Sequence, residues 1–185
     1  MILNKSNFLE MDLTNKIIIF PTDTVYGIVC LFNDLEAIKK IYEIKQRDYS
    51  KPMAILCSDI PTVRSLIAEN TNLETNWIKH WPGKLTLILP KNNKINDLIT
   101  AGRNTVGVRI PNHEISLSIL KKYGPMVVTS LNLSTEPPIL LFKDVLKYED
   151  LVDYVIDGGD LCSDASTVYD TINKKTLRNG PVFID

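Results

Sequence analysis

The chain has 185 residues, of which 44% are hydrophobic and 23% are charged, as in ordinary globular proteins. Its formal net charge is −1, from 21 basic and 22 acidic residues, which argues against a nucleic-acid coat protein and a polybasic membrane binder. No apolar run is long enough to span a bilayer, and the first residues lack the basic-then-apolar pattern of a secretory signal. We therefore expect one domain, residues 1–185, in a cytoplasmic protein with no membrane partner.

Apolar, β-branched runs predict strands, and amphipathic or capped segments between them predict helices. The predicted strands are Ile17–Pro21, Met53–Cys57, Leu85–Pro90, Thr105–Pro111, Met126–Thr129, Tyr154–Asp157 and Ser166–Asp170. The predicted helices cover residues 4–13, 35–45, 60–69, 73–81, 114–122 and 143–151. Because the strands at 85–90 and 105–111 follow each other without a helix between them, the pattern indicates an α/β fold with a mixed sheet.

Cysteine and histidine are too sparse for most chemistry that depends on them. Cys30, Cys57 and Cys162 are odd in number and far apart, so they predict neither a disulfide framework nor a zinc site. Each is expected to be a small buried apolar residue. His80 and His113 are too few for a multi-histidine metal site, and no metal-binding residue is predicted.

The segment Pro21–Gly27 is the first candidate site. An apolar run ends at Pro21 and leads into Thr22-Asp23-Thr24, and Gly27 then allows the backbone to turn. Open α/β sheets bind ligands beyond the carboxyl ends of their strands. Threonine and aspartate are also ordinary turn residues, so a ligand site and a capped turn fit these residues equally well.

A cationic segment follows the predicted helix 35–45. It contains Lys45, Arg47 and Lys51. Arginine can hold a phosphate through two hydrogen bonds and lysine acts as a point charge, so the segment could face an anion. Cations also stabilise the C-terminus of a helix, and a simple helix-stop signal explains the same residues.

Strand alternation places Thr105, Gly107 and Arg109 on one face of the strand at 105–111. An arginine on a face thinned by glycine suggests an approach path for a ligand, although a solvated arginine on an edge strand has the same pattern.

Two later segments repeat the association of a strand end with polar side chains. Ser130 and Asn132 follow the strand at 126–129, and Ser166-Thr167 precede Arg178 near the end of the chain. Local turns and caps would explain them as well. The chain has neither a P-loop nor the G-x-G-x-x-G fingerprint. Together these strand ends favour a site for a polyanion such as a nucleoside triphosphate, with catalysis by positioning and charge neutralisation.

A set of motifs, in this order along the chain, resembles the YrdC-type threonylcarbamoyl-AMP synthase family in its short, single-domain form. The motifs are Pro21–Gly27, Lys45-x-Arg47, Trp81-Pro82-Gly83, Val106–Pro111, Ser130-x-Asn132, Ile156–Gly159, Ser166-Thr167-Val168 and Leu177-Arg178-x-Gly180. The resemblance implies an open, twisted, mixed β-sheet flanked by helices, with a concave ligand cleft.

The resemblance also implies a reaction. The family joins L-threonine, bicarbonate and ATP into threonylcarbamoyl-AMP and pyrophosphate, for the threonylcarbamoyladenosine modification of tRNA. Mg²⁺ is expected to arrive with ATP, held mainly by phosphate oxygens. A complex with a threonylcarbamoyl transferase and weak binding of tRNA are further possible partners. The alternatives are a YrdC-like RNA-binding module without synthase activity and the carbamoyl-adenylate chemistry of hydrogenase-maturation proteins.

Residue roles follow from the same resemblance. The L-threonine site would comprise Thr24, Arg109, Val128, Ser166 and Thr167. The ATP site would comprise Lys45, Arg47, Lys51, Thr105, Ser130, Asn132 and Arg178. Lys45 and Arg47 are expected to act as the catalytic residues at the triphosphate. Asp23 is expected to order its loop rather than to act as a base.

The chain departs from the family pattern at several positions. Leu131 lies between the serine and the asparagine of the Ser-x-Asn motif, where the family usually has a small residue. Residues 134–138 replace a glycine-containing turn. Asp48 stands where a proline often follows the arginine, and we expect it to pair with Lys45 or Lys51.

Overall fold

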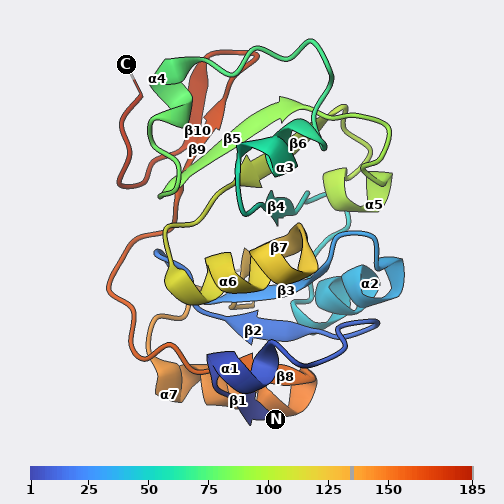
Figure 1. The fold of residues 1–185 in the computed structure, drawn as a ribbon, viewed down its shortest axis with the longest axis vertical. Helices are drawn as coiled ribbons and strands as arrows, with labels where there is room; N and C mark the ends of the chain where they lie inside the picture. Colours follow the sequence, from blue (N-terminus) through green and yellow to red (C-terminus); the bar gives the residue numbers. More distant parts are fainter. Residues whose placement is uncertain (134–135, 185) are drawn as a thin grey trace.

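A mixed β-sheet runs along the whole molecule (Figure 1). The computed structural model describes residues 1–133 and 136–184. Within them the strands lie in the order β1-β8-β2-β3-β7-β4-β6-β5-β9-β10. Their bounds are Ile2–Leu3 (β1), Ile18–Phe20 (β2), Gly27–Leu31 (β3), Ala54–Leu56 (β4), Leu85–Pro90 (β5), Thr105–Arg109 (β6), Met126–Ser130 (β7), Tyr154–Ile156 (β8), Thr167–Asp170 (β9) and Lys175–Arg178 (β10).

Parallel and antiparallel neighbours alternate irregularly across the sheet. The pairs β1–β8, β2–β8, β4–β6 and β5–β9 are parallel, and the other neighbours are antiparallel. The prediction of an open, mixed sheet flanked by helices is confirmed. Every predicted strand is present, while β1, β3 and β10 were not predicted.

The helices are mostly shorter than the sequence pattern predicts. Their bounds are Lys5–Phe8 (α1), Leu35–Ile44 (α2), Ile60–Arg64 (α3), Thr75–Ile78 (α4), Asp97–Thr100 (α5), Glu114–Tyr123 (α6) and Phe142–Val145 (α7), with a 3₁₀ helix at Leu146–Leu151 (η1). Only α2 and α6 match their predicted lengths closely. The helix predicted to continue to residue 69 stops early because Ile67 forms a β-bridge with Lys91 and the N–H of Ala68 donates to Pro90. None of the described helices is long and apolar enough to cross a membrane.

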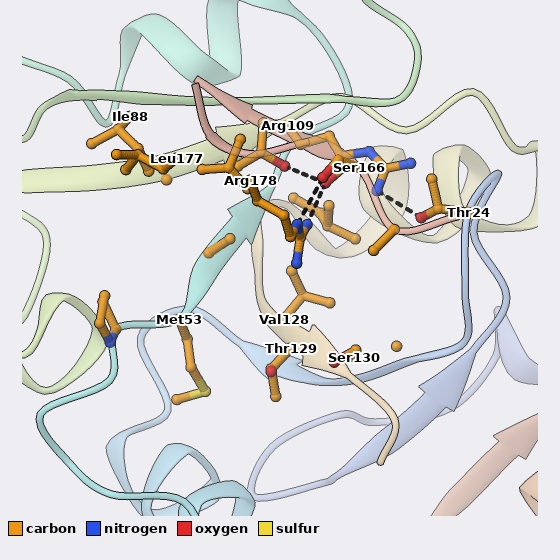
Figure 2. Close-up of a pocket in the computed structure, with 18 of the residues that line it drawn as sticks. Thr24, Met53, Ile88, Arg109, Val128, Thr129, Ser130, Ser166, Leu177 and Arg178 are labelled. Carbon is orange, nitrogen blue, oxygen red and sulfur yellow. Dashed lines mark hydrogen bonds between the residues drawn. The ribbon is translucent and has the colours of Figure 1, made fainter. Parts of the chain in front are cut away.

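The pleat of the sheet separates its side chains into two faces. On the face that we call the open face, Phe20, Val29 and Ile156 pack against α1 and α6. This smaller apolar cluster covers the part of the sheet around β1, β8, β2 and β3 and reaches Met126 of β7 and Leu56 of β4. Over the remaining strands the open face is hollowed into a cavity (Figure 2).

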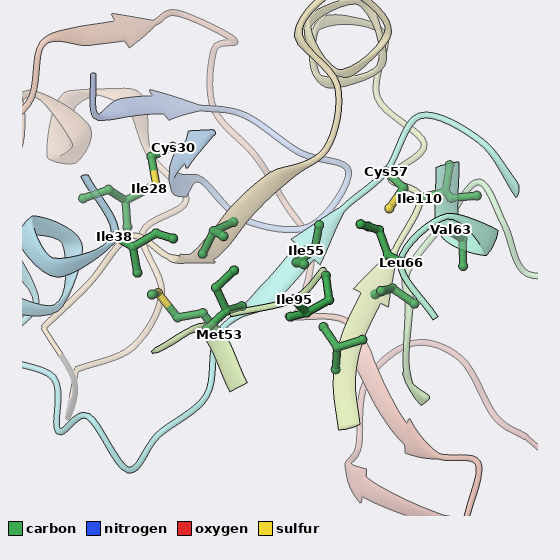
Figure 3. Close-up of a cluster of buried hydrophobic side chains, with 14 of the residues drawn as sticks. Ile28, Cys30, Ile38, Met53, Ile55, Cys57, Val63, Leu66, Ile95 and Ile110 are labelled. Carbon is green, nitrogen blue, oxygen red and sulfur yellow. The ribbon is translucent and has the colours of Figure 1, made fainter. Parts of the chain in front are cut away.

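The opposite face, which we call the closed face, carries the larger apolar cluster (Figure 3). Ile28 and Ile55 extend from the sheet into this cluster, where Ile38 of α2 lies beside Ile28, and Val63 of α3 joins the cluster near Leu66. Asp34 caps α2 by accepting from the N–H of Ala37 at 3.0 Å, which fixes where that apolar helix face begins.

The cysteines follow the expectation of burial in two positions of three. Cys30 and Cys57 are buried, and burial raises the pKa of both thiols. Cys162 is exposed, because its segment crosses the surface outside any described helix or strand.

Truncation of Ile55 tests whether the closed face carries the stability of the fold. Ile55 is fully buried in β4, between Val127 and Val108 on the neighbouring strands. We expect Ile55→Ala to lower the free energy of unfolding by about 2–5 kcal/mol, because it leaves a cavity in the core. Urea denaturation measures this. Ile172→Ala, at a side chain 53% exposed, is the matched control and should change stability by less than about 0.5 kcal/mol. An equal decrease in the free energy of unfolding in the two variants would contradict this account of the core.

Candidate functional site

The cavity on the open face has a volume of about 400 Å³, which suits a small molecule. Alternate residues of four strands, β4, β5, β6 and β9, line it, among them Ala54, Gly107 and Val168. A Cβ at Gly107 would lie 3.3 Å from Cδ1 of Ile88, so glycine keeps the cavity deep at this point. Figure 2 shows Arg109, Ser166 and Arg178 on one side of the cavity and Val128, Thr129 and Ser130 on the other.

The register of the strands sets the long dimension of the cavity. Arg109 pairs with Leu56, at the C-terminal ends of the parallel strands β6 and β4. Thr105 lies four residues earlier on β6, which is about 13 Å along the strand. Beyond Thr105, at the N-terminal ends of β6 and β4, the cavity is also lined by Arg103, which precedes β6, and by Pro52, which precedes β4. We call the two extremes the Arg109 end and the Arg47 end.

At the Arg109 end, a buried guanidinium is held from three sides. Arg109 is 6% exposed and donates from Nε to the carbonyl of Gly83 at 2.9 Å. Its Nη1 donates to Thr24 Oγ1 at 2.8 Å, and its Nη2 donates to Asp23 Oδ1 at 2.5 Å. Burial lowers the pKa of Arg109 and Asp23 opposes this, but a guanidinium stays charged in any protein. Three of the five N–H groups are thus used, and the other two can meet a ligand carboxylate.

The segment around Thr24 is itself ordered. The hydroxyl oxygens of Thr22 and Thr24 are 3.0 Å apart, and the Thr22 hydroxyl donates to the carbonyl of Val25 at 2.8 Å. Both threonines are almost fully buried and both line the cavity. The Pro21–Gly27 segment is therefore a wall of the cavity and not only a capped turn.

The last part of the chain closes the cavity opposite β7. Arg178 donates from Nε to the carbonyl of Ser166 at 2.9 Å and from Nη2 to its Oγ at 3.0 Å. Ser166 Oγ also lies 2.8 Å from Thr86 Oγ1. Gly180 permits this approach, since a Cβ there would lie 2.5 Å from the backbone nitrogen of Thr167.

The two arginines at the Arg47 end differ in their contacts. Arg47 donates from Nη2 to the carbonyl of Pro52 at 2.9 Å and from Nε to that of Lys51 at 3.2 Å, so it folds back on its own segment. Arg103 lines the cavity, and its side chain makes no hydrogen bond or ion pair with any described residue. Asp48 accepts from the N–H of Ser50 at 2.7 Å, and no ion pair with a lysine is found for it among the described residues.

Lys45 lies outside the cavity lining. Its side chain is buried, and Nζ donates to the carbonyl oxygens of Ser130 and Asn132 and, at 3.0 Å, to Asn132 Oδ1. Burial lowers the pKa of Lys45 to about 7, and the nearby charge of Arg47 adds to this effect. Ser130 Oγ donates to the same Oδ1 at 2.7 Å. In this structure Lys45 therefore fixes the segment that carries Ser130 into the cavity.

The lining is strongly cationic. Four arginines and one carboxylate, that of Asp170, line it among the described residues. The Asp170 oxygens already accept from the N–H groups of Ile172 and Asn173 and from the amide of Asn173. Within the described ranges, no group of three or more histidine, cysteine, aspartate or glutamate side chains could hold a metal ion. The cavity is therefore suited to an anionic ligand.

The predicted site residues separate into two groups. Those in the cavity lining are Thr24, Arg47, Thr105, Arg109, Val128, Ser130, Ser166 and Arg178. Those outside it are Lys45, Lys51, Asn132 and Thr167. Thr167 is the clearest case, because strand alternation turns it to the closed face, where its hydroxyl donates to the carbonyl of Val182 at 2.8 Å.

Sequence reasoning missed several lining residues. The polar ones are Thr22, Thr86, Arg103, Thr129 and Asp170. Alternation along β5 and β9 could have found Thr86 and Asp170, because they share a face with Ile88 and Val168. No signal in the sequence pointed to Arg103, which follows the left-handed residues Ala101 and Gly102.

Comparison with known proteins now identifies the family. The family model Sua5_yciO_yrdC, described as "Telomere recombination", matches residues 12–180. The chain belongs to this family. A Bacillus subtilis (strain 168) protein named threonylcarbamoyl-AMP synthase is 35% identical over 149 residues, which are 78% of this chain and 43% of the relative. An Idiomarina loihiensis protein of the same name is 31% identical over 173 residues, 88% of this chain and 91% of the relative.

A solved structure of the Sua5/YciO/YrdC family extends the comparison to the fold. The crystal structure of Pyrococcus abyssi Sua5 complexed with L-threonine superimposes with a TM-score of 0.89 at 30% identity. The match covers 97% of this chain and 57% of that one. The chain thus spans about half the length of some relatives, such as the B. subtilis protein, and nearly all of the I. loihiensis protein.

The buried ammonium of Lys45 should give stability a characteristic dependence on pH. Between pH 7 and the ordinary lysine pKa near 10.5, Lys45 has lost its proton in the folded protein and keeps it in the unfolded chain. Folding stability should therefore rise with pH in this window, by up to about 1.4 kcal/mol per pH unit, and this rise should be absent in Lys45→Met. Urea denaturation from pH 7 to 9.5 measures the difference.

Lys94→Met is the control, because Lys94 is exposed. In this variant, folding stability should rise with pH as steeply as it does in the wild type. Parallel stability curves for the wild type and Lys45→Met would contradict a lowered pKa at Lys45.

Proposed function

We propose that this protein is an L-threonylcarbamoyladenylate synthase, which forms threonylcarbamoyl-AMP and pyrophosphate from L-threonine, bicarbonate and ATP. One observation carries this proposal. One cationic cavity has a fixed guanidinium at the Arg109 end and two further arginines at the other end. The length of β6 from Arg109 to Thr105, about 13 Å, separates the two ends, so the cavity can hold two anionic substrates in line. The names of the relatives support the same function.

L-Threonine suits the Arg109 end. The two unused N–H groups of Arg109 can donate hydrogen bonds to an α-carboxylate. The hydroxyls of Thr24 and Ser166 lie beside this position and can form hydrogen bonds with the amino acid. Val128 offers methyl groups to a short side chain. The P. abyssi relative was crystallised in complex with this amino acid, which supports L-threonine as a ligand.

ATP suits the Arg47 end. Arg47 and Arg103 supply charge for the triphosphate, and Thr105 and Ser130 supply hydroxyl groups. Lys51 is exposed beside the lining residue Pro52 and could add a third cation. Asp170, the one carboxylate among the described lining residues, has its oxygens occupied by its own turn, so Mg²⁺ would enter on the phosphate oxygens as part of the substrate.

The reaction then requires little covalent chemistry from the protein. The threonine amine and bicarbonate give a carbamate with loss of water, a carbamate oxygen attacks the α-phosphorus, and the bond to pyrophosphate breaks. The described lining contains no cysteine or histidine that could act as a nucleophile or base. Its arginines would orient the two substrates and neutralise the charge that moves to pyrophosphate. Transfer of the threonylcarbamoyl group to tRNA would fall to a partner transferase in the cytoplasm.

The decisive experiment is a synthase assay with pyrophosphatase present. We expect phosphate release and a new adenylate product only when ATP, bicarbonate and L-threonine are all supplied. Omitting one substrate at a time is the control. If phosphate release is independent of L-threonine, the proposed function is refuted, and tight, salt-sensitive tRNA binding without turnover would favour an RNA-binding module.

Two arginine variants should separate the ends of the cavity. Arg109→Ala should raise KM for L-threonine more than tenfold, and Arg47→Ala should raise KM for ATP by a similar factor, because each removes a charged hydrogen-bond donor. Steady-state kinetics with each substrate varied in turn measures this. Arg64→Ala is the control, since Arg64 lies on α3 and donates to the carbonyl of Thr71 at 2.6 Å. If both variants raised the same KM, the two-ended arrangement would be wrong.

A further inference from the structure

Among the described residues, two buried polar atoms lack a hydrogen-bond partner near the segment that carries Asp23. They are Oδ2 of Asp23 and Nδ1 of His113. Asp23 belongs to the segment between β2 and β3, and His113 lies at the N-terminus of α6. Neither side chain lines the cavity. A carboxylate oxygen without a donor and an imidazole nitrogen without a partner are chemically complementary.

The surrounding contacts hold the two residues near each other. The hydroxyl of Ser116 on α6 is fully buried and donates to the carbonyl of Pro21 at 2.5 Å, which ties the start of this helix to the segment that carries Asp23. The charge of Asp23 reaches the imidazole: burial lowers the pKa of His113, while Asp23 and, more weakly, Glu114 raise it. These two carboxylates are the charged groups that act on His113.

The first oxygen of Asp23 already has a defined task. It accepts from Arg109 Nη2 at 2.5 Å, with the Asp23 side chain 10% exposed and that of Arg109 7% exposed. A carboxylate bound through one oxygen can still rotate about its Cβ–Cγ bond, and a donor on the second oxygen stops this rotation. Carboxylates that orient a neighbouring group generally work in this way.

We propose, building on the function above, that Asp23 and His113 are positioning residues for the substrate-binding Arg109. His113 takes the tautomer with a hydrogen on Nδ1 and donates it to Asp23 Oδ2 once a small rotation of the two side chains brings the atoms, which are not bonded in this structure, within reach. The carboxylate then holds the guanidinium so that its two unused N–H groups point at the amino-acid carboxylate. Neither residue touches the substrate.

The first experiment is made on the protein without a ligand. The chain contains only two histidines, so their NMR signals can be told apart. Side-chain NMR titration gives the pKa of His113, with His80 as an internal control. Asp23→Asn should lower the pKa of His113 and leave that of His80 unchanged, because it removes the nearby negative charge. The Nε–H signal of Arg109 should also exchange faster in Asp23→Asn and in His113→Gln. An unchanged His113 titration in Asp23→Asn overturns the proposed pair.

The second experiment measures L-threonine. Asp23→Asn and His113→Gln should each raise KM for L-threonine about tenfold with a smaller change in kcat, the range typical of residues that orient a ligand-binding group. KM for ATP should not change. Because the two residues act as one unit, the double variant should be no worse than Asp23→Asn alone. Asp150→Asn, at an exposed carboxylate, is the control.

The possible results separate the two proposals. Full additivity of the two substitutions overturns the joint action of Asp23 and His113. If the wild-type protein does not use L-threonine, the function proposed above fails, and the NMR titration and the Arg109 exchange rate still decide whether the pair positions Arg109. If Asp23→Asn does not fold, the exchange rate of the Arg109 Nε–H is measured in His113→Gln instead. An exchange rate equal to that of the wild type then overturns the proposal.

Discussion

The alternation of side chains across the sheet is the constraint on which the rest of the structure depends. On β6 it turns Val106 and Val108 into the apolar cluster of the closed face and Gly107 and Arg109 into the cavity. The same two-residue period holds on β4, where Ile55 is core and Ala54 is lining. A one-residue slip of β6 would bury Arg109 in the core and expose two valines, so the fold and the site are specified by the same hydrophobic pattern.

Two buried cations show how differently this fold can compensate a charge. Arg109 is neutralised by Asp23 and still keeps N–H groups for a ligand. Lys45 has no carboxylate partner in the described part of the chain and directs its ammonium to three oxygens of the Ser130–Asn132 segment. A buried charge needs several good acceptors to offset the loss of water. The first arrangement suits binding, and the second suits the ordering of a neighbouring segment.

Much of the fold could be predicted from the sequence, because the central strands are apolar and continuous. β3 was missed because Gly27 was interpreted as a turn residue, although the next four residues are apolar. β10 has no buried residue, so no hydrophobic pattern in the sequence predicts it. It is a strand because it pairs with β9. The site was predictable wherever a strand carried it, as at Thr105 and Arg109. It was not predictable at Arg103 or Lys45, where the direction of a side chain depends on contacts between distant segments.

The position of Leu131 illustrates how a departure from the family pattern can leave the site unchanged. Leu131 is bulkier than the small residue that the family usually has between the serine and the asparagine, and residues 134 and 135 of the neighbouring departure lie outside the described ranges. Leu131 is fully buried in the cluster of the closed face, and its N–H donates to the carbonyl of Tyr26 at 2.8 Å. Since alternation sends Ser130 into the cavity and Leu131 away from it, the larger side chain fills the core and leaves the lining free. The serine and asparagine that flank it keep their contacts with each other and with Lys45, so the family's polar pair tolerates a leucine at this position.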